Sequence, residues 1–350
     1  MDPERPNLFE YATSELSQDA FLCWLLKWAD PACRSFSQAL HEAGMDLIRI
    51  FSAEKNLLPQ QVNSIKVDKQ LGHIDVLCTI NEHEDTRTAI LIEDKRGTQE
   101  HSEQLQRYKE LLSRGFPRDR IIPVYVQTGD QSDYSGVRSQ GYSVVSRPCL
   151  LNVLEKRVDA RRESDILDGF LRHLRSIEND VQSWESKAPE DWSWNAWTGF
   201  YMKLQSMPSS SIQGVWDYVP IGHFLCYSFG DWDSSEGIDQ TWLHIDHTKG
   251  TLCFRILISG SVSDTKARYA LRDYWHNCII SRCKELGIPA RKPERFGKIS
   301  SVTLTVAEIG RKDWLLVQDG HIDFDATVSR MEACVEVVRY CVKHGPRSME

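Results

Sequence analysis

Residues 88–127 place the strongest constraint on what this chain of 350 residues can fold into. The run Ala89-Ile90-Leu91-Ile92 is apolar on both faces of a strand, so it predicts a central strand whose sheet is covered on both sides. A helical pattern follows, from Thr98 as the N-cap to about residue 113, and residues 121–127 form a second apolar strand. This spacing predicts a right-handed crossover between two parallel strands.

Two helices and a hairpin are expected before this crossover. Helical periodicity covers residues 15–29 and then residues 33–50. The period then changes to two, which predicts strands over residues 65–68 and 73–80 around a turn at Gln70-Leu71-Gly72. The expected class is therefore α/β or α+β, with a mixed sheet flanked by helices.

The composition changes after about residue 190, because eight of the 11 tryptophans lie beyond that point. We expect two domains, residues 1–185 and 190–350, with residues 183–189 either as a linker or as part of a helical bridge. Further elements are expected as a strand at 142–146, helices at 148–157 and 164–184, strands at 242–247 and 251–259, and helices at 263–286 and 327–344.

The composition favours a cytoplasmic protein without membrane contact. The sequence has no run of about 18 apolar residues, and its start lacks the basic and apolar segments of a secretory signal. The ten cysteines are scattered without C-x-x-C pairs, which is typical of reduced thiols. The net charge of −8 is unlike that of a typical nucleic-acid binder, so any such contact must come from a local basic patch.

Charged residues gather at the ends of the expected strands. Alternate residues of a strand share a face, so Glu93 and Lys95 should point the same way and Asp94 the other way. Asp75 lies on the neighbouring strand, where it can stand beside Glu93. Two adjacent carboxylates repel each other unless a divalent cation lies between them, and hard oxygen ligands suit Mg²⁺.

A site of this kind predicts phosphodiester hydrolysis. A metal held by Asp75 and Glu93 leaves positions for water and for a phosphate oxygen, and it lowers the pKa of the bound water. Lys95 would orient that water and offset the charge that develops on the phosphoryl group.

Two segments resemble the D…E-x-K signature of the PD-(D/E)XK nuclease superfamily: His73-Ile74-Asp75-Val76-Leu77 and Ile90-Leu91-Ile92-Glu93-Asp94-Lys95. Ile74 stands where that signature commonly has a proline. The resemblance covers roughly residues 8–130 and implies an α/β restriction-endonuclease-like sheet, with an additional α+β C-terminal region. It also implies a deoxyribonuclease that depends on Mg²⁺ or Mn²⁺, with Asp75, Glu93 and Lys95 as catalytic residues.

Two further segments resemble elements of related nucleases. Residues 14–22 are similar to the opening helix of a bacterial, defence-associated branch, in which an acid, here Glu15, completes the metal site. The segment Gln104-Leu105-Gln106-Arg107-Tyr108 is similar to the Q-x-x-x-Y element of RecB-like nucleases, which implies a positioning role for Gln104 in catalysis. Positions i and i+4 share a helical face, so Gln104 and Tyr108 could both face the site.

The substrate that the resemblance implies is DNA. Between residues 95 and 120, seven basic residues outnumber four acidic ones, and we expect Arg96, Arg107, Tyr108 and Lys109 to contact nucleic acid. Control by a regulatory protein partner or by homo-oligomeric assembly, and a role in antiviral defence, are expected by analogy alone.

Each candidate residue also has a simpler interpretation. The three charged strand residues could form only a surface ion cluster. Glu15 could be a first-turn acid that interacts with the helix dipole, in which case Glu10 is the substitute ligand. Gln104 and Tyr108 could belong to a helix face that packs on the sheet.

The C-terminal region carries zinc-ligand residue types at His244, Asp246, His247 and Cys253. The two histidines would fall on opposite faces of a strand, so packing and surface roles are favoured over a zinc site. The clustered Trp192, Trp194 and Trp197 could stack on bases, but core packing, anchoring the second domain, is the default expectation. The alternative function for the whole chain is a catalytically silent binding module or a structural subunit of a larger complex.

Overall fold

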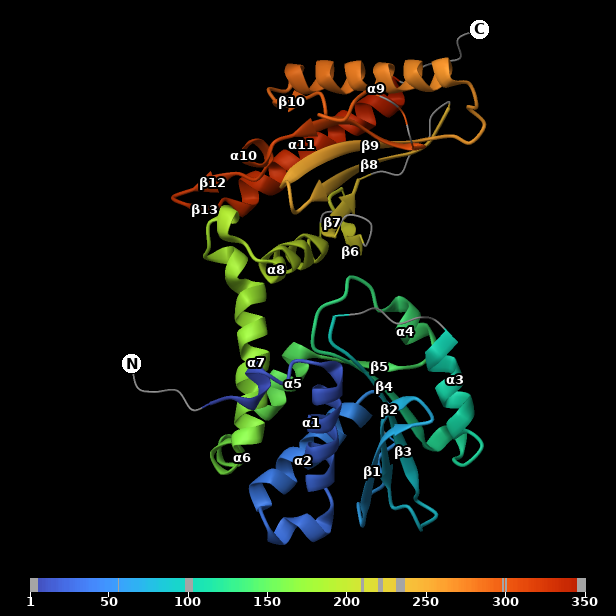
Figure 1. Cartoon of the computed structure of the whole chain (residues 1–350), viewed down its shortest axis with the longest axis vertical. Coiled ribbons are helices and arrows are strands. Elements are labelled where there is room, and N and C mark those ends of the chain that lie inside the picture. The colour runs from blue at the N-terminus through green and yellow to red at the C-terminus, as the bar shows by residue number, and fades with distance from the viewer. Residues whose placement is uncertain are drawn as a thin grey trace. The chain divides into compact units, whose positions relative to one another are not determined.

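Two large sheets organise the structure, a computed structural model that describes residues 6–55, 57–97, 103–208, 211–219, 223–230, 237–297, 299 and 301–344 (Figure 1). The chain divides into two units, Met1–Asn179 and Asp180–Glu350. The boundary lies inside helix α7 (Asp165–Gln182), slightly before the expected segment 183–189. The carboxylate of Asp180 accepts hydrogen bonds from Ser193 and Asn195, which ties the end of α7 to the second unit.

The first unit contains a five-stranded mixed sheet in the order β1-β2-β3-β4-β5. Its strands are β1 (Ile65–Leu71), β2 (Ile74–Ile80), β3 (Thr88–Lys95), β4 (Ile121–Gln127) and β5 (Ser143–Ser146). The strands β1, β2 and β3 pair antiparallel, whereas β4 lies parallel to β3 and β5 parallel to β4. The expected α/β class, mixed sheet and parallel crossover are therefore confirmed.

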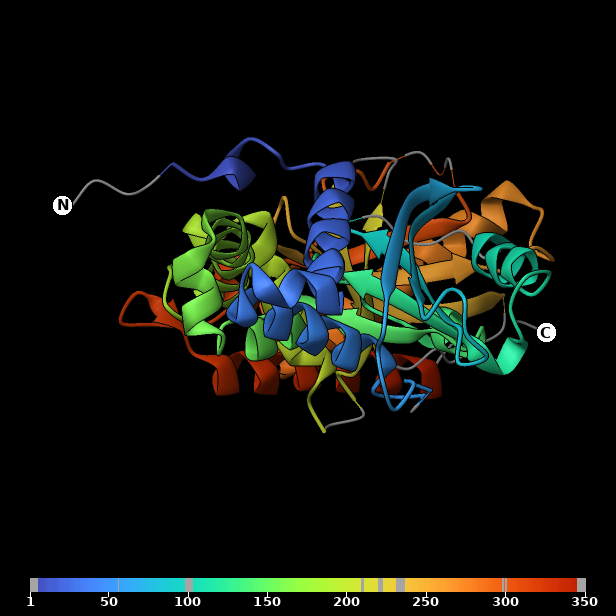
Figure 2. The ribbon, with the colours of Figure 1, turned by 90° about the horizontal axis from the view of Figure 1, so that it is seen from below.

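Helices cover both faces of this sheet. They include α1 (Glu15–Trp28), α2 (Gln38–Ser52), α3 (Glu103–Leu112), α5 (Arg147–Leu154) and α7, with shorter helices η1 (Leu8–Glu10), η3 (Arg118–Arg120), α4 (Ser135–Ser139) and α6 (Val158–Glu163). In Figure 2, α1 and α2 lie on one side of the strands and α3 on the other. Ile90 and Ile92 of β3 join the core with α1 and α2, whereas Ala89 and Leu91 join the core with α3.

One helix start differs from the expectation, and the expected N-cap of another helix lies outside the described residues. A single helix was expected over residues 33–50, but the chain forms a short 3-10 helix, η2 (Pro31–Ser35), before α2 begins at Gln38. The reason is Ser37, whose hydroxyl accepts a hydrogen bond from the Leu40 N–H at 3.0 Å and so caps α2. Thr98, the expected N-cap of α3, lies outside the residues that the structure describes.

The second unit is built on a six-stranded antiparallel sheet in the order β10-β11-β9-β8-β7-β6. Its strands are β6 (Gly214–Val219), β7 (Phe224–Phe229), β8 (Ile238–Asp246), β9 (Thr251–Ile258), β10 (Ala290–Arg291) and β11 (Thr303–Ile309). The other elements are η4 (Ser183–Glu185), η5 (Pro189–Asp191), α8 (Trp194–Gln205), α9 (Thr265–Glu285), α10 (Arg311–Trp314), α11 (Phe324–Lys343) and a small hairpin of β12 (Val317–Gln318) and β13 (His321–Ile322).

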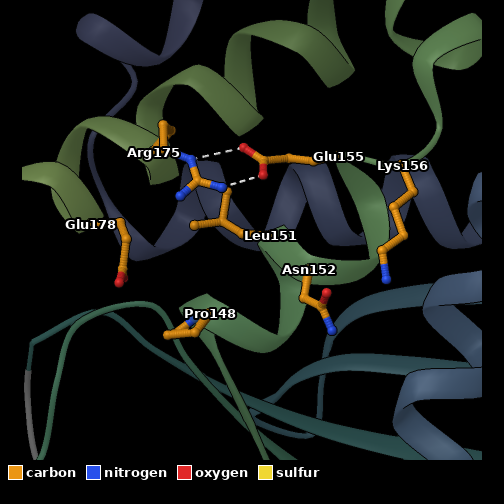
Figure 3. A pocket seen from close by; sticks show the side chains of 7 residues that line it. All are labelled: Pro148, Leu151, Asn152, Glu155, Lys156, Arg175 and Glu178. Carbon is orange, nitrogen blue, oxygen red and sulfur yellow. Dashed lines mark hydrogen bonds and ion pairs between the residues drawn. The ribbon is translucent and has the colours of Figure 1, made fainter.

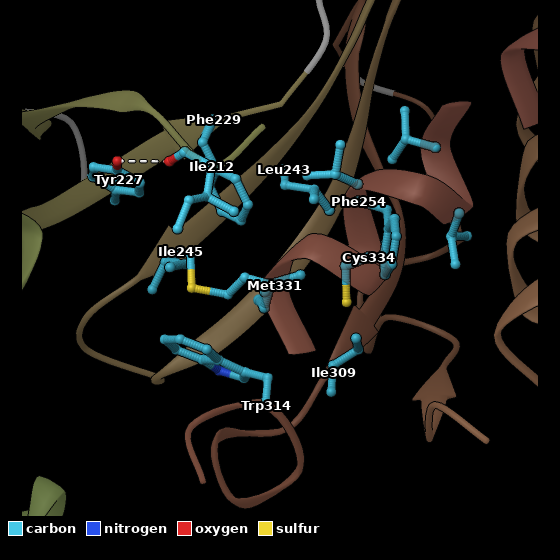
Figure 4. Close-up of a cluster of buried hydrophobic side chains, with 14 of the residues drawn as sticks. Ile212, Tyr227, Phe229, Leu243, Ile245, Phe254, Ile309, Trp314, Met331 and Cys334 are labelled. Carbon is cyan, nitrogen blue, oxygen red and sulfur yellow. Dashed lines mark hydrogen bonds between the residues drawn. The ribbon is translucent and has the colours of Figure 1, made fainter. Parts of the chain in front are cut away.

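The expected strands and helices of this unit are confirmed as β8, β9, α9 and α11. The strands β6, β7 and β11 were missed. Polar residues interrupt the apolar pattern of β6 and β11, whereas β7, with the sequence FLCYSF, has a pattern that is typical of a strand. Helices α8, α9 and α11 pack on one face of the sheet, where Ile245 and Phe254 meet Met331 of α11 (Figure 4). Trp192 and Trp197 are buried in the same core, which confirms core packing for both. The prediction is wrong for Trp194, which is 42% exposed.

Two compositional expectations can also be compared with the structure. All ten cysteines are free thiols. Over the described ranges, no helix combines the length and the apolar character that crossing a bilayer requires.

The opposite face of the six-stranded sheet carries His244, which is 6% exposed and lies 3.2 Å from the Ser228 hydroxyl. His247 instead contacts the ring of Trp194 on α8, with centroids 5.0 Å apart. The two histidines therefore have different neighbours. No three His, Cys, Asp or Glu side chains of the described residues form a group that could hold a metal ion.

Burial of His244 gives this unit a pH-dependent stability. Burial, assisted by the positive charge of Arg255, lowers the pKa of His244 to about 3 from an ordinary value of 6.5. The unfolded state therefore binds more protons than the folded state below pH 6.5, so stability is lost as the pH falls. Between pH 6.5 and 5.5 the loss should be about 1 kcal/mol.

We expect the free energy of unfolding in urea to fall by about this amount in the wild type and much less in His244→Asn. Tryptophan fluorescence suits the measurement because most tryptophans lie in this unit. An identical pH dependence in both proteins would contradict the assignment.

Candidate active site

The ends of β2 and β3 bring three of the predicted residues together. The register pairs Val76 with Ile92, so the positions just beyond this pair are Asp75 on β2 and Glu93 on β3. The Lys95 ammonium lies 2.6 Å from Glu93 Oε1 and 4.0 Å from Asp75 Oδ2. One ammonium group therefore lies within reach of both carboxylates, as the strand alternation predicts.

Asp94 points to the other face of β3. Its Oδ1 accepts a hydrogen bond of 2.5 Å from Gln18 Nε2 of α1. Its backbone N–H donates to Asp75 Oδ2 at 2.9 Å. The backbone of β3 thus holds the Asp75 carboxylate in place while the Asp94 side chain faces α1.

Helix α3 supplies the support for Glu93. Gln104 Nε2 donates a hydrogen bond to Glu93 Oε1 at 3.0 Å and lies 2.7 Å from the Tyr108 hydroxyl. Tyr108 is only 3% exposed and belongs to the core between α3 and the sheet. Tyr108 is therefore a core residue, as the simpler interpretation expects, and it helps to hold Gln104 against Glu93.

The electrostatics of this cluster are unusual for a folded core. Glu93 is fully buried, and burial followed by the charge of Asp75 raises its pKa to about 7. Burial alone would lower the pKa of Lys95, but its hydrogen bond to Glu93 and the charges of Glu93 and Asp75 raise it. Lys95 therefore stays charged at neutral pH, and its charge favours ionisation of Glu93.

Glu15 reaches the same end of β3 from the first turn of α1. Its Oε1 accepts a hydrogen bond of 3.2 Å from the Arg96 backbone N–H, so it caps the end of the strand. Glu10, the substitute ligand, lines a separate pocket together with Glu155 and Arg175. Of the two early acids, only Glu15 is thus placed at this end of the sheet.

The donor set of Asp75 and Glu93 fits Mg²⁺. Glu93 Oε2 is buried without a hydrogen-bond partner, which leaves an acceptor available inside the cluster. Mg²⁺ keeps several waters and is commonly held by one or two carboxylates plus substrate phosphates. Within the described part of the chain, Glu15 does not join these two in a three-residue metal group, so the expected third ligand is not found there.

A groove of about 530 Å³ adjoins Gln104. It lies between α3 and the β1–β2 turn, where Gly72 and His73 both have positive φ angles of 61° and 73°. Its lining includes the predicted residues Arg107 and Tyr108, and also His73 and Arg114. A two-residue turn with two positive φ angles is typical of a tight hairpin, and here it places His73 at the groove.

The other two predicted nucleic-acid contacts are placed differently. Arg96 directly follows β3 and donates its backbone N–H to Glu15. Lys109 donates a hydrogen bond to the Gln140 carbonyl at 2.6 Å, so its ammonium is engaged in a contact within the fold. Lys109 does not line the groove with Arg107, because positions i and i+2 of a helix point to different sides.

A polar network under α1 was missed by the sequence analysis. Asp19 and Asp94 are 2% and 1% exposed, and Gln18 bridges Asp94 to the Thr128 hydroxyl. Burial raises the pKa of Asp19 to about 6 and that of Asp94 well above its ordinary value. The available signal was Gln18-Asp19 on the buried side of an apolar helix, where polar residues need partners.

A second pocket of the first unit shows a different pattern of charges (Figure 3). Its side chains are Pro148, Leu151, Asn152, Glu155, Lys156, Arg175 and Glu178. Arg175 makes a bidentate pair with Glu155, and Glu178 pairs with Arg147 at 2.9 Å. Both carboxylates of this pocket pair with arginines. The pocket therefore differs from the ends of β2 and β3, where two carboxylates lie side by side.

Comparisons with known proteins do not assign a family. No protein-family model matches the chain, and searches of curated proteins and of solved structures returned no similar protein. The site is therefore interpreted from its own geometry.

We expect Mg²⁺ to raise the thermal stability of the wild type. Free Mg²⁺ at tenfold its Kd should add about 1.4 kcal/mol, and Asp75→Asn and Glu93→Gln should abolish the gain because each removes a ligand. Differential scanning calorimetry with and without Mg²⁺ measures the effect. Asp85→Asn, an exposed carboxylate between β2 and β3, is the matched control and should keep the full shift. An equal shift in all four proteins would place the Mg²⁺ site elsewhere.

Proposed function

We propose that this chain is a metal-dependent nuclease that hydrolyses phosphodiester bonds of DNA. The observation that carries the proposal is the buried Glu93 carboxylate, beside Asp75 and 2.6 Å from the Lys95 ammonium, with Oε2 left free. The order of two helices, three antiparallel strands, a helix and a parallel strand further supports a restriction-endonuclease-like core. A buried carboxylate with a raised pKa next to a lysine, as Glu93 has, is a feature that reactive sites share.

In this proposal Asp75 and Glu93 hold Mg²⁺ or Mn²⁺. When bound, the ion supplies Lewis acidity that lowers the pKa of a water and neutralises charge on a phosphate. Lys95 presents a fixed positive charge beside the two carboxylates and stabilises the negative charge that develops on the phosphoryl oxygens. Gln104 keeps the Glu93 carboxylate oriented through its hydrogen bond, and Tyr108 keeps Gln104 oriented in turn.

The groove beside Gln104 supports DNA as the substrate. Arg107 and Arg114 line it, and both carry charges that attract a phosphate backbone. The overall charge of −8 opposes non-specific binding, so the groove would concentrate the attraction in one place. Regulation by a protein partner or by assembly of several copies, and a role in antiviral defence, belong to the same proposal by analogy.

Cleavage of supercoiled and linear DNA in Mg²⁺ or EDTA tests the activity. We expect Mg²⁺-dependent cleavage, a loss of about 10²–10³-fold in rate for Lys95→Ala, and loss of both cleavage and metal response for Asp75→Ala. Lys66→Ala is the matched control, because Lys66 lies on β1 of the same sheet and its ammonium group makes an ion pair with Glu82. Its rate should equal that of the wild type.

Two outcomes would separate the alternatives. Cleavage that persists in Lys95→Ala and Asp75→Ala would locate the activity elsewhere. DNA binding without cleavage in the wild type, with and without co-purified partners, would favour the catalytically silent binding module.

The groove gives a separate prediction for binding. In a Lys95→Ala background, Arg107→Gln should weaken duplex DNA binding and reduce the slope of log K against log salt by about 0.9, the value for one lost phosphate contact. Fluorescence anisotropy between about 50 and 200 mM salt measures the slope. Arg162→Gln, which removes an exposed arginine from α6, should leave the slope unchanged. A slope that does not respond to Arg107→Gln would exclude the groove as the DNA path.

A further inference from the structure

The second unit contains a cavity of about 270 Å³ on the face of its sheet that the helices leave uncovered. Its floor is formed by alternate residues of β8, β9 and β11, and the segment after β10 forms a wall that includes Phe296. Arg272 of α9 fixes this wall by donating hydrogen bonds of 2.6 Å to the carbonyls of Phe296 and Gly297. The volume is slightly below the usual range of about 300–1,000 Å³ for small-molecule sites, so the cavity suits one small molecule.

Arg255 of β9 lines this cavity and lacks an anionic partner. Its Nε is buried without a hydrogen-bond acceptor, and among the described residues no carboxylate makes an ion pair with it. Arg255 is partly buried, which lowers its pKa, and its guanidinium carbon lies 5.5 Å from the centre of the Trp242 ring. A guanidinium stays charged in proteins, so a partly buried one without a carboxylate partner can accept an anionic ligand.

A buried arginine with a structural role, Arg147, has different charged neighbours. Arg147 of the first unit is 1% exposed, and its guanidinium pairs with Asp130 and with Glu178, both at 2.9 Å. A buried arginine that only supports the fold is thus neutralised here by two carboxylates. Arg255 is only partly buried, and among the described residues no carboxylate pairs with it, which leaves its guanidinium available to a ligand in the cavity.

Two of the three acids that line the cavity are engaged within the fold. Asp246 Oδ1 accepts hydrogen bonds from the N–H and the hydroxyl of Thr248, at 2.9 and 2.6 Å, and so stabilises the β8–β9 turn. Glu308 pairs with Arg291 at 3.0 Å. The third acid, Glu294, is outweighed by the cations of the lining, which are Lys249, Arg255, Arg272 and Arg295, so the net charge of the lining is positive.

The remaining lining residues indicate what kind of anion fits. Lys249 and Arg295 add two further cations, which favours a doubly charged phosphate over a single carboxylate. Phe224 and Phe296 also line the cavity, and aromatic rings stack readily on flat heterocycles. The planar guanidinium fork of Arg255 matches the geometry of a phosphate.

We propose that this cavity binds a nucleoside monophosphate, with its phosphate on Arg255 and its base against the phenylalanine rings. The site lies wholly in the second unit and shares no residue with the proposed nuclease site, so its test does not depend on cleavage.

Isothermal titration calorimetry of the full chain with AMP, GMP, CMP, UMP and inorganic phosphate tests the proposal. We expect at least one nucleotide to bind, and to bind more tightly than phosphate. Arg255→Gln should weaken that binding at least tenfold, and Arg255→Lys should weaken it less because it keeps the charge but loses the fork. Arg339→Gln removes an arginine of α11 that pairs with Glu336 outside the cavity, and it should bind like the wild type.

Thermal unfolding separates a ligand site from a structural role. Without ligand, Arg255→Gln should be as stable as the wild type or more stable, because it removes an unpaired, partly buried charge, whereas Arg147→Gln should be less stable. The nucleotide should raise the Tm of the wild type and not that of Arg255→Gln.

Three results would overturn the proposal. They are the absence of binding by all four nucleotides, equal affinity in the wild type and Arg255→Gln, and phosphate binding as tightly as the nucleotides.

Discussion

The ion pair between buried Glu93 and Lys95 is the interaction on which the candidate site depends. A carboxylate with no exposed surface has lost its hydration, which costs several kcal/mol unless a cation and hydrogen bonds compensate. Lys95 and Gln104 provide that compensation, while Asp75 on the neighbouring strand opposes it. Apolar residues of similar size would stabilise the fold at least as well. The arrangement keeps two carboxylates together although they repel each other, and the proposed metal site would account for this cost.

The alternation of a strand explains how one short segment supports two polar clusters. Glu93 and Lys95 turn toward α3, whereas Asp94 turns toward Gln18 and Asp19 on α1. The two clusters are joined through the backbone, because the Asp94 N–H holds the Asp75 carboxylate. A change on the α1 side would thus be transmitted to the ligand side of the sheet. This connection gives the polar network under α1 a role in holding the site, beyond packing of the helix.

An arginine in each unit has a different charged environment. Arg147 is buried with two carboxylates and completes the first unit, and its charges are balanced within the fold. Arg255 is placed on a sheet face beside a cavity with no such partners among the described residues. The difference lies in what surrounds each guanidinium, since both belong to regular parts of the chain.

The sequence by itself determined the order of elements in the first unit and the residues that share each face of β3, because side-chain period and apolar runs are local properties. It therefore predicted that Asp75, Glu93 and Lys95 would meet. Only the tertiary structure decided that Glu15 caps the Arg96 N–H, that Lys109 turns to the Gln140 carbonyl, and that Tyr108 lies in the core. Those outcomes depend on how each helix sits on the sheet. The sequence could not predict that Arg255 Nε lacks a hydrogen-bond partner, since the neighbours of a side chain are defined only by the residues that folding brings around it.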